Sequence, residues 1–145
     1  MTQSADPPLK ILFVCIGNSC RSPMAEAWAN HFGQGKVQAF SAGSYPLGVI
    51  TGATYEVMQE RGISLAGQRS KGLREIPVNE MDVVVGMGCE VMCPVPSGYK
   101  GRLIEWSIPD PYNQGIESFR NVRDMIEKQV QALLADLALP RDSGQ

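Results

Sequence analysis

The chain contains a single histidine, His31, among its 145 residues. His31 falls near the end of a helix predicted to begin just after Arg21, roughly 15 Å along the helix axis from that start at a rise of about 1.5 Å per residue. Schemes in which a histidine activates a cysteine or a serine, such as Cys–His pairs and Ser–His–Asp triads, are therefore excluded. Any nucleophile in this chain must be activated by other groups.

Long apolar runs and clusters of one charge sign are also absent. No run approaches the roughly 18 apolar residues of a membrane helix, and the first eight residues lack the basic and apolar regions of a signal peptide. Lys and Arg together number 13 against 15 Asp and Glu, a formal net charge of −2. We therefore expect a cytoplasmic protein with neither a membrane nor nucleic acid as partner, and we expect it to be a monomer.

Short apolar segments alternate with helical patterns along the chain, which is typical of an α/β fold. Strands are predicted at residues 10–14, 37–41, 81–87 and 102–106, and helices at about 21–32, 51–61 and 115–137. Residues 64–79 contain two glycines and a proline, so an irregular segment with a short helix is expected there. The sequence predicts a single domain over residues 1–145, ordered from about 9 to 139. Its core is a four-stranded parallel sheet with helices on both faces.

The most informative segment runs from Cys15 to Arg21, between the first strand and the first helix. A loop this short turns its backbone N–H groups inward, and the start of the helix adds further donors and a positive dipole end. An arginine at the helix start can clamp two oxygens of a tetrahedral oxyanion. The candidate oxyanion-binding residues are Ile16, Gly17, Asn18, Ser19, Cys20, Arg21 and Ser22.

Cys15 lies at the floor of this predicted cradle. A neighbouring cation and a helix N-terminus favour the thiolate, which is the nucleophilic form of cysteine. The alternative is that Cys15 is an ordinary buried strand residue and that Ser22 only caps the helix. The combination of a strand, a Cys-x5-Arg-Ser spacing, an internal Gly-Asn and a helix favours catalysis by Cys15 and Arg21.

Asp110 is the candidate acid and base. The segment Ile108-Pro109-Asp110-Pro111-Tyr112 follows the last predicted strand, so Asp110 falls at the same edge of the sheet as Cys15. One carboxyl group beside the loop could protonate a leaving oxygen and later activate water. The alternative is an Asp-Pro turn with a solvated side chain. Tyr112 and Tyr45 could either line a rim of the site or pack in a half-buried position.

The segment from Val14 to Glu26 resembles the phosphate loop of the low-molecular-weight protein tyrosine phosphatases and of their relatives, the thiol-coupled arsenate reductases. The resemblance runs from about Lys10 to Leu137. It implies a phosphate loop after the first strand, and a substrate that is either a small oxyanion (arsenate, phosphate or sulfate) or phosphotyrosine. It implies no bound cofactor.

Two further cysteines, Cys89 and Cys93, follow the third predicted strand and favour the reductase branch. In a reductase a first thiol takes up arsenate, a second expels arsenite, and a third carries the disulfide outward. The resemblance adds Cys89 and Cys93 to the catalytic set and implies an external thiol reductant such as thioredoxin or glutaredoxin with glutathione. One departure is that the thioredoxin-coupled reductases usually carry cysteine where Gly88 stands. The two residues could also be ordinary small apolar residues at a strand end.

No metal site is expected. Cys15 and Cys20 belong to the oxyanion loop, and the Cys-x3-Cys spacing of Cys89 and Cys93 is unusual for zinc. The favoured interpretation is a thiol-dependent arsenate reductase, with phosphomonoester hydrolysis through a phosphocysteine as the alternative. A protein that only binds oxyanions, or senses oxidation through Cys15 and Cys20, is a third hypothesis, against which the presence of Asp110 argues.

Overall fold

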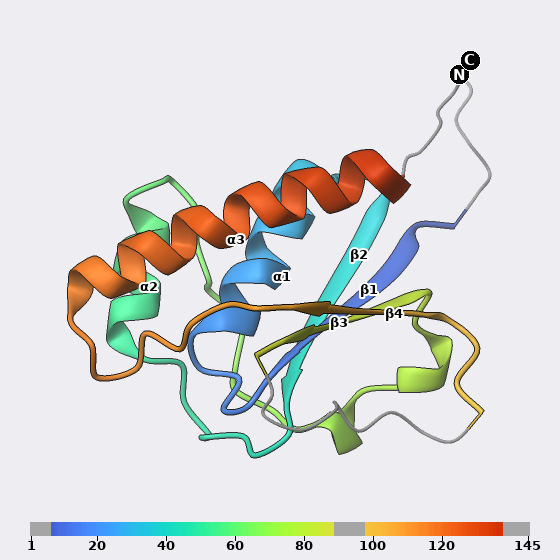
Figure 1. Ribbon diagram of the computed structural model, residues 1–145, viewed down its shortest axis with the longest axis horizontal. Helices are drawn as coiled ribbons and strands as arrows, with labels where there is room; N and C mark the ends of the chain where they lie inside the picture. The colour runs from blue at the N-terminus through green and yellow to red at the C-terminus, as the bar shows by residue number, and fades with distance from the viewer. Residues whose placement is uncertain (1–6, 89–97, 138–145) are drawn as a thin grey trace.

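One parallel sheet organises the chain (Figure 1). The structure is a computed structural model that describes residues 7–88 and 98–137. The strands lie in the order β2-β1-β3-β4 and span Leu9–Cys15 (β1), Val37–Gly43 (β2), Val83–Met87 (β3) and Arg102–Trp106 (β4). β1 therefore lies inside the sheet, paired on both sides, and its last residue pairs with the last residue of β2. The predicted four-stranded parallel sheet is confirmed.

The two faces of the sheet are covered unequally. Successive side chains of a strand point to opposite faces, and in β1 Ile11, Phe13 and Cys15 face the larger hydrophobic cluster. The three α-helices all contribute to that cluster: α1 (Arg21–Phe32), α2 (Gly52–Gln59) and α3 (Ile116–Leu137). Figure 1 shows them together on one side of the sheet.

The opposite face is covered by two short 3-10 helices, η1 (Leu73–Glu75) and η2 (Val78–Glu80). Leu12 and Val14 of β1 pack here with Val78, on a smaller hydrophobic cluster. Both faces of the sheet thus carry helices, as the sequence predicts, but the second face carries only these single turns. They occupy the segment expected to be irregular.

The helix boundaries follow local signals. α2 is shorter than predicted and ends at Gln59, because the chain turns away through Gly62. Gly62 has a φ of 74° and its N–H donates to the Gln59 carbonyl, a conformation that glycine adopts without strain. Among the helices of residues 7–88 and 98–137, none combines the length and apolarity needed to cross a bilayer.

Candidate functional site: an oxyanion loop around Cys15

Cys15 is the last residue of β1, and its thiol faces the start of α1. Its side chain is buried, and Sγ lies 2.9 Å from Oγ of Ser22 and 3.4 Å from the Ser22 backbone nitrogen. Both Ser22 groups belong to the first turn of α1, whose N–H groups have no partner within the helix. The strand and the helix thus bring the Cys15 sulfur against the positive end of a helix.

The carbonyl groups of the loop between β1 and α1 point outward. They accept hydrogen bonds from the segment that follows β2 and from Ser70. The pairs are Ser44 N to Cys15 O (3.1 Å), Tyr45 N to Ile16 O (2.8 Å), Leu47 N to Gly17 O (2.9 Å), Ser70 Oγ to Gly17 O (2.9 Å) and Thr51 N to Ser19 O (3.2 Å). In a trans peptide the carbonyl and the next N–H point to opposite sides, and the described residues contain no cis peptide. The N–H groups of Ile16, Gly17, Asn18 and Cys20 therefore point into the loop.

Asn18 braces the loop from the inside. It is fully buried and has a φ of 48°, in the left-handed region that asparagine tolerates better than most residues. Its Oδ1 accepts from the Lys71 backbone N–H at 2.8 Å, which fixes the orientation of the amide. Its Nδ2 then donates to Oγ of Ser22 at 2.8 Å. Because that oxygen accepts from Asn18, the Ser22 hydroxyl hydrogen is available to Sγ of Cys15.

Arg21 is anchored at the edge of the sheet where β3 and β4 end. Its Nη1 donates to the carbonyls of Met87 (2.8 Å) and Ile108 (3.1 Å), and the side chain is buried. Nε is buried and has no hydrogen-bond partner among the described residues. Since a buried guanidinium N–H without an acceptor is costly, Nε is a donor suited to an oxyanion. Because Nη1 is held by two carbonyls and the guanidinium is planar, the directions of Nε and Nη2 are fixed as well.

Asp110 lies on the open side of Arg21. Its Oδ2 is 3.7 Å from Nη2 of Arg21, and its Oδ1 accepts from the Tyr112 backbone N–H at 3.1 Å. The side chain is 52% exposed, so the carboxyl group is held beside the guanidinium but still reaches solvent. This position suits exchange of protons with water and with a group bound over Cys15.

A cavity of about 170 Å³ opens over Cys15. Its lining combines the loop, the guanidinium and the aromatic rim: Cys15, Ile16, Gly17, Ser19, Cys20, Arg21, Tyr45, Leu47, Asp110 and Tyr112. The sequence allows Tyr45 and Tyr112 either to line the rim of the site or to pack in a half-buried position. In the structure both side chains are exposed and form part of the rim. Their apolar surface surrounds a floor of hydrogen-bond donors, as in a site that orients a small anion.

Cys20, the second thiol of the loop, is buried and differs from Cys15 in its contacts. Its Sγ lies 3.6 Å from Oγ of Ser19 and 3.6 Å from Oγ1 of Thr51. Burial raises the pKa of the Cys20 thiol, an effect that outweighs the hydrogen bonds from these hydroxyls. Cys20 therefore stays protonated near neutral pH and contributes its backbone N–H to the loop.

A half-buried ion pair supports the loop, and it was not predicted from the sequence. Oε1 of Glu26 accepts from Oγ of Ser41 at 2.6 Å and lies 3.9 Å from Nζ of Lys71. Burial raises the pKa of Glu26 and lowers the pKa of Lys71, and the attraction between the two charges opposes both shifts. The pair fixes the segment whose backbone holds Asn18. Glu26 lies in the segment that carries the resemblance, but its partner is 45 positions away, so no local pattern reveals the pair.

The predicted site residues are brought together as far as the structure describes them. Cys15, Ile16, Gly17, Ser19, Cys20, Arg21 and Asp110 line one cavity. Asn18 and Ser22 are fully buried behind this lining, where Nδ2 of Asn18 donates to Oγ of Ser22. Cys89 and Cys93 lie outside the described residues. His31 lies in the last turn of α1, edge-on to the stacked rings of Trp28 and Phe32 and away from the cavity lining.

Comparison with known proteins agrees with this geometry. Residues 10–142 match the family described as low molecular weight phosphotyrosine protein phosphatase, and the chain belongs to this family. A glutaredoxin arsenate reductase of Synechocystis sp. is 37% identical over 131 residues, which cover 89% of this chain and 98% of that protein. An arsenate reductase of Bacillus cereus is 34% identical over 122 residues, 83% of this chain and 90% of that protein.

A solved structure supports the same relationship. An arsenate reductase in the phosphate-binding state superposes with a TM-score of 0.83 at 34% identity, covering 90% of this chain and 99% of that one. The chain thus belongs to a family described by its phosphatases, and the relatives named above are arsenate reductases.

Proposed function

We propose that this protein is an arsenate reductase in which Cys15 is the nucleophile. The observation that carries the proposal is the position of the Cys15 thiol at the floor of an oxyanion cradle, without a histidine to serve as base. The relatives named arsenate reductase support the choice of arsenate over other tetrahedral oxyanions. Arsenate and phosphate share shape and charge, so the same donors serve both anions.

The reaction uses two thiols and balances as a two-electron reduction. The Cys15 thiolate attacks arsenic and an oxygen leaves as water, giving an arsenic(V) thioester on Sγ. A second thiol then attacks Sγ, the sulfur–arsenic bond breaks, and its electron pair stays on arsenic. Arsenite, arsenic(III), is released and the two sulfurs form a disulfide. An external thiol reductant regenerates the enzyme.

The described residues have separate roles in this scheme. The loop N–H groups and Arg21 bind the oxyanion oxygens and stabilise the charge that develops on them. Ser22 donates to the attacking sulfur, and Asp110 delivers the proton that the departing oxygen needs. Cys93 is proposed as the thiol that carries the disulfide outward, and Cys89 as the one that releases arsenite.

Phosphomonoester hydrolysis is the second candidate function. The position of Asp110 beside Arg21, together with the exposed rings of Tyr45 and Tyr112, favours an aryl phosphate in the same cavity. In that reaction water, rather than a thiol, clears the phosphocysteine. A reductase that also hydrolyses aryl phosphates is consistent with the proposal.

One preparation of the protein tests both functions. Arsenite production is measured with thioredoxin and its reductase, and separately with glutaredoxin and glutathione, while p-nitrophenyl phosphate reports hydrolysis. We expect arsenite with at least one thiol system, and loss of both activities in Cys15→Ser. Hydrolysis of p-nitrophenyl phosphate without arsenite from any thiol system would overturn the reductase proposal.

The cysteine variants separate the two chemistries. Cys93→Ser and Cys89→Ser should stop multiple-turnover arsenite production and spare p-nitrophenyl phosphate hydrolysis, with the larger effect at Cys93. Full arsenite production by both variants would show that an external thiol attacks the arsenic-bound sulfur directly and that neither residue takes part.

A further inference from the structure

Helix α2 connects the oxyanion loop to α3. At its N-terminal end, the Thr51 backbone nitrogen lies 3.2 Å from the Ser19 carbonyl oxygen, and Oγ1 of Thr54 donates to the same oxygen at 2.8 Å. Oγ1 of Thr51 lies 2.7 Å from Oγ1 of Thr54, so the two hydroxyls are held together. The start of α2 therefore fixes the direction of the Ser19 carbonyl.

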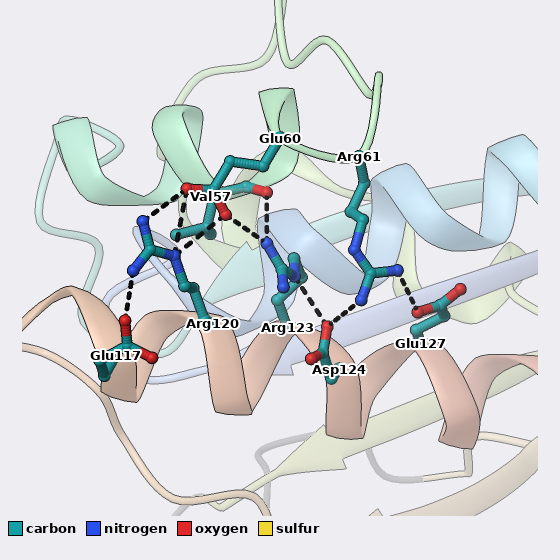
Figure 2. Close-up of polar contacts among 8 residues, drawn as sticks. All are labelled: Val57, Glu60, Arg61, Glu117, Arg120, Arg123, Asp124 and Glu127. Atoms are coloured by element: carbon teal, nitrogen blue, oxygen red, sulfur yellow. Dashed lines mark hydrogen bonds and ion pairs between the residues drawn. The ribbon is translucent and has the colours of Figure 1, made fainter.

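At its other end, α2 is bound by two arginines of α3 (Figure 2). Nη1 of Arg123 donates to the Val57 carbonyl at 3.0 Å and to Oε1 of Glu60 at 2.7 Å. Glu60 also accepts from Nη2 of Arg120 at 2.8 Å. These hydrogen bonds, first from Arg120 and then from Arg123, lower the pKa of Glu60 to about 2.

Arg123 serves as the C-terminal cap of α2. The last carbonyls of a helix lack partners within it, and here the carbonyls of Glu56, Met58 and Gln59 accept from the chain that follows α2. The Val57 carbonyl accepts from Arg123. A guanidinium at this position also interacts favourably with the helix dipole. Arg123 is 6% exposed, so these acceptors, together with Oδ1 of Asp124 at 2.8 Å from Nε, compensate the cost of burying its charge.

An eight-residue helix is marginal by itself, and its position must come from its contacts. Val57 and Met58 are fully buried against the core, which opposes separation of α2 from the protein. Apolar contacts are not directional, so they do not fix how far α2 is rotated or shifted along its axis. The hydrogen bonds at the two ends are directional. A shift at the Arg123 end moves the threonines at the Ser19 end.

We propose that Arg123 is a positioning residue for oxyanion binding, acting through α2 on the Ser19 carbonyl. Because the peptide between Ser19 and Cys20 is planar, the direction of this carbonyl sets the direction of the Cys20 N–H, one of the donors that point into the loop. The proposal rests on the proposed oxyanion site at Cys15. It holds whether the bound anion is reduced or hydrolysed.

The test compares two arginines of the same helix. Arg123→Met removes the donor to Val57, whereas Arg120→Met removes a partner of Glu60 that does not touch the α2 backbone. The dissociation constant of inorganic phosphate is measured by titration calorimetry, with thermal unfolding followed in parallel. We expect a loss of affinity of about ten-fold for Arg123→Met, corresponding to about 1.4 kcal/mol, and less than about two-fold for Arg120→Met. Equal, small effects of the two substitutions would overturn the proposal.

A double-mutant cycle with Thr54→Val tests whether Arg123 acts through α2 on the Ser19 carbonyl. Thr54→Val removes the hydroxyl that binds the Ser19 carbonyl and keeps the shape of the side chain. If Arg123 acts through that hydrogen bond, Arg123→Met should cost much less affinity in the Thr54→Val background than in the wild type. Additive losses would show that Arg123 only stabilises the fold and would overturn the proposal.

Glu60→Gln provides a second variant in which no buried side chain is replaced. Glu60 is partly exposed, and its replacement weakens the anchoring of Arg123 but leaves the donor to Val57 in place. We expect a smaller loss of phosphate affinity than for Arg123→Met, again reduced in the Thr54→Val background. If Arg123→Met does not fold, the double-mutant cycle of Glu60→Gln with Thr54→Val tests the proposal in its place. Wild-type protein that binds no phosphate would instead contradict the proposed function itself.

Discussion

A Cβ atom at position 88 would lie 2.5 Å from Nη1 of Arg21. It would also lie 2.9 Å from the Ile108 carbonyl oxygen, and Gly88 has a φ of 85°. We expect Gly88→Ala to displace Arg21 from its two carbonyl acceptors and to lower kcat/KM for arsenate by about ten-fold or more, since the fork must match two oxygens of the anion. Steady-state kinetics measure the effect.

Gly98→Ala is the matched control for this substitution. Gly98 has the same φ of 85°, but a Cβ there would meet no atom of residues 7–88 and 98–137 within 4 Å. Both variants should lose about 1 kcal/mol of stability from backbone strain, and only Gly88→Ala should lose activity beyond that. Similar kinetics for the two variants would show that the contact with Arg21 is unimportant. The same contact leaves no room for a larger side chain at position 88 unless Arg21 moves.

Ser22→Ala should slow the reaction of Cys15 with iodoacetamide. The Ser22 hydroxyl, oriented by Asn18, is a donor to Sγ, and losing it removes a hydrogen bond to the thiolate worth roughly 1–3 kcal/mol. We expect the rate of alkylation to fall by about ten-fold, as followed by mass spectrometry of the intact protein. Ser19→Ala is the control, because Oγ of Ser19 contacts Cys20 instead. An unchanged rate in Ser22→Ala would exclude Ser22 from thiolate stabilisation.

Arg21→Lys should be nearly as damaging as Arg21→Ala. A lysine keeps the charge but cannot donate at once to the carbonyls of Met87 and Ile108 and to the anion, because it lacks a planar fork. We expect both variants to lose about 100-fold or more in kcat/KM. Near-normal kinetics of the lysine variant would show that charge alone is sufficient.

Asp110→Asn should depress hydrolysis most for phosphate esters with poor leaving groups. Such groups depend on protonation, and the amide cannot supply a proton. The measurement compares kcat for p-nitrophenyl phosphate with kcat for phenyl phosphate, in the variant and in the wild type. Equal losses for the two substrates would indicate that the side chain only holds the turn through the Tyr112 N–H.

The lowered pKa of Glu60 should make the stability of the fold depend on pH. Its folded-state pKa of about 2 lies below the value of about 4.3 expected in the unfolded chain. The carboxylate therefore contributes stability above the unfolded pKa, and the contribution is lost as the pH falls toward 2. Glu60→Gln should reduce the slope of unfolding free energy against pH in that range, measured by urea titrations. A wild-type slope in the Glu60→Gln variant would contradict this prediction.

The oxyanion loop could be predicted from the sequence because its information is local. Cys15, Arg21 and Ser22 follow one another across a strand, a turn and a helix, and each element has its own pattern. Asp110 could be placed because strands of a parallel sheet end at one edge. Cys15, Arg21 and Asp110 line one cavity, while their chemical roles stay predictions.

What the sequence could not reveal depends on contacts between distant segments. The loop carbonyls accept from residues that follow β2, and Lys71 reaches Asn18 across 53 positions. The steric role of Gly88 requires the packed Arg21 side chain, which no spacing indicates. The α2 contacts were missed for the same reason, since Thr54 reads as an ordinary helix residue until Ser19 lies against it.

The central position of β1 has a consequence for how the site opens. Strand β1 is hydrogen-bonded on both sides, so its amide protons can exchange with solvent only when the neighbouring strands separate. Cys15 ends this strand, and the proposed nucleophile therefore follows one of the two inner strands of the sheet. The segment after β2, which holds the loop carbonyls, is more exposed and should exchange its amides sooner. Hydrogen–deuterium exchange should therefore be faster for the amides that follow β2 than for those of β1, which should exchange only when the whole protein unfolds.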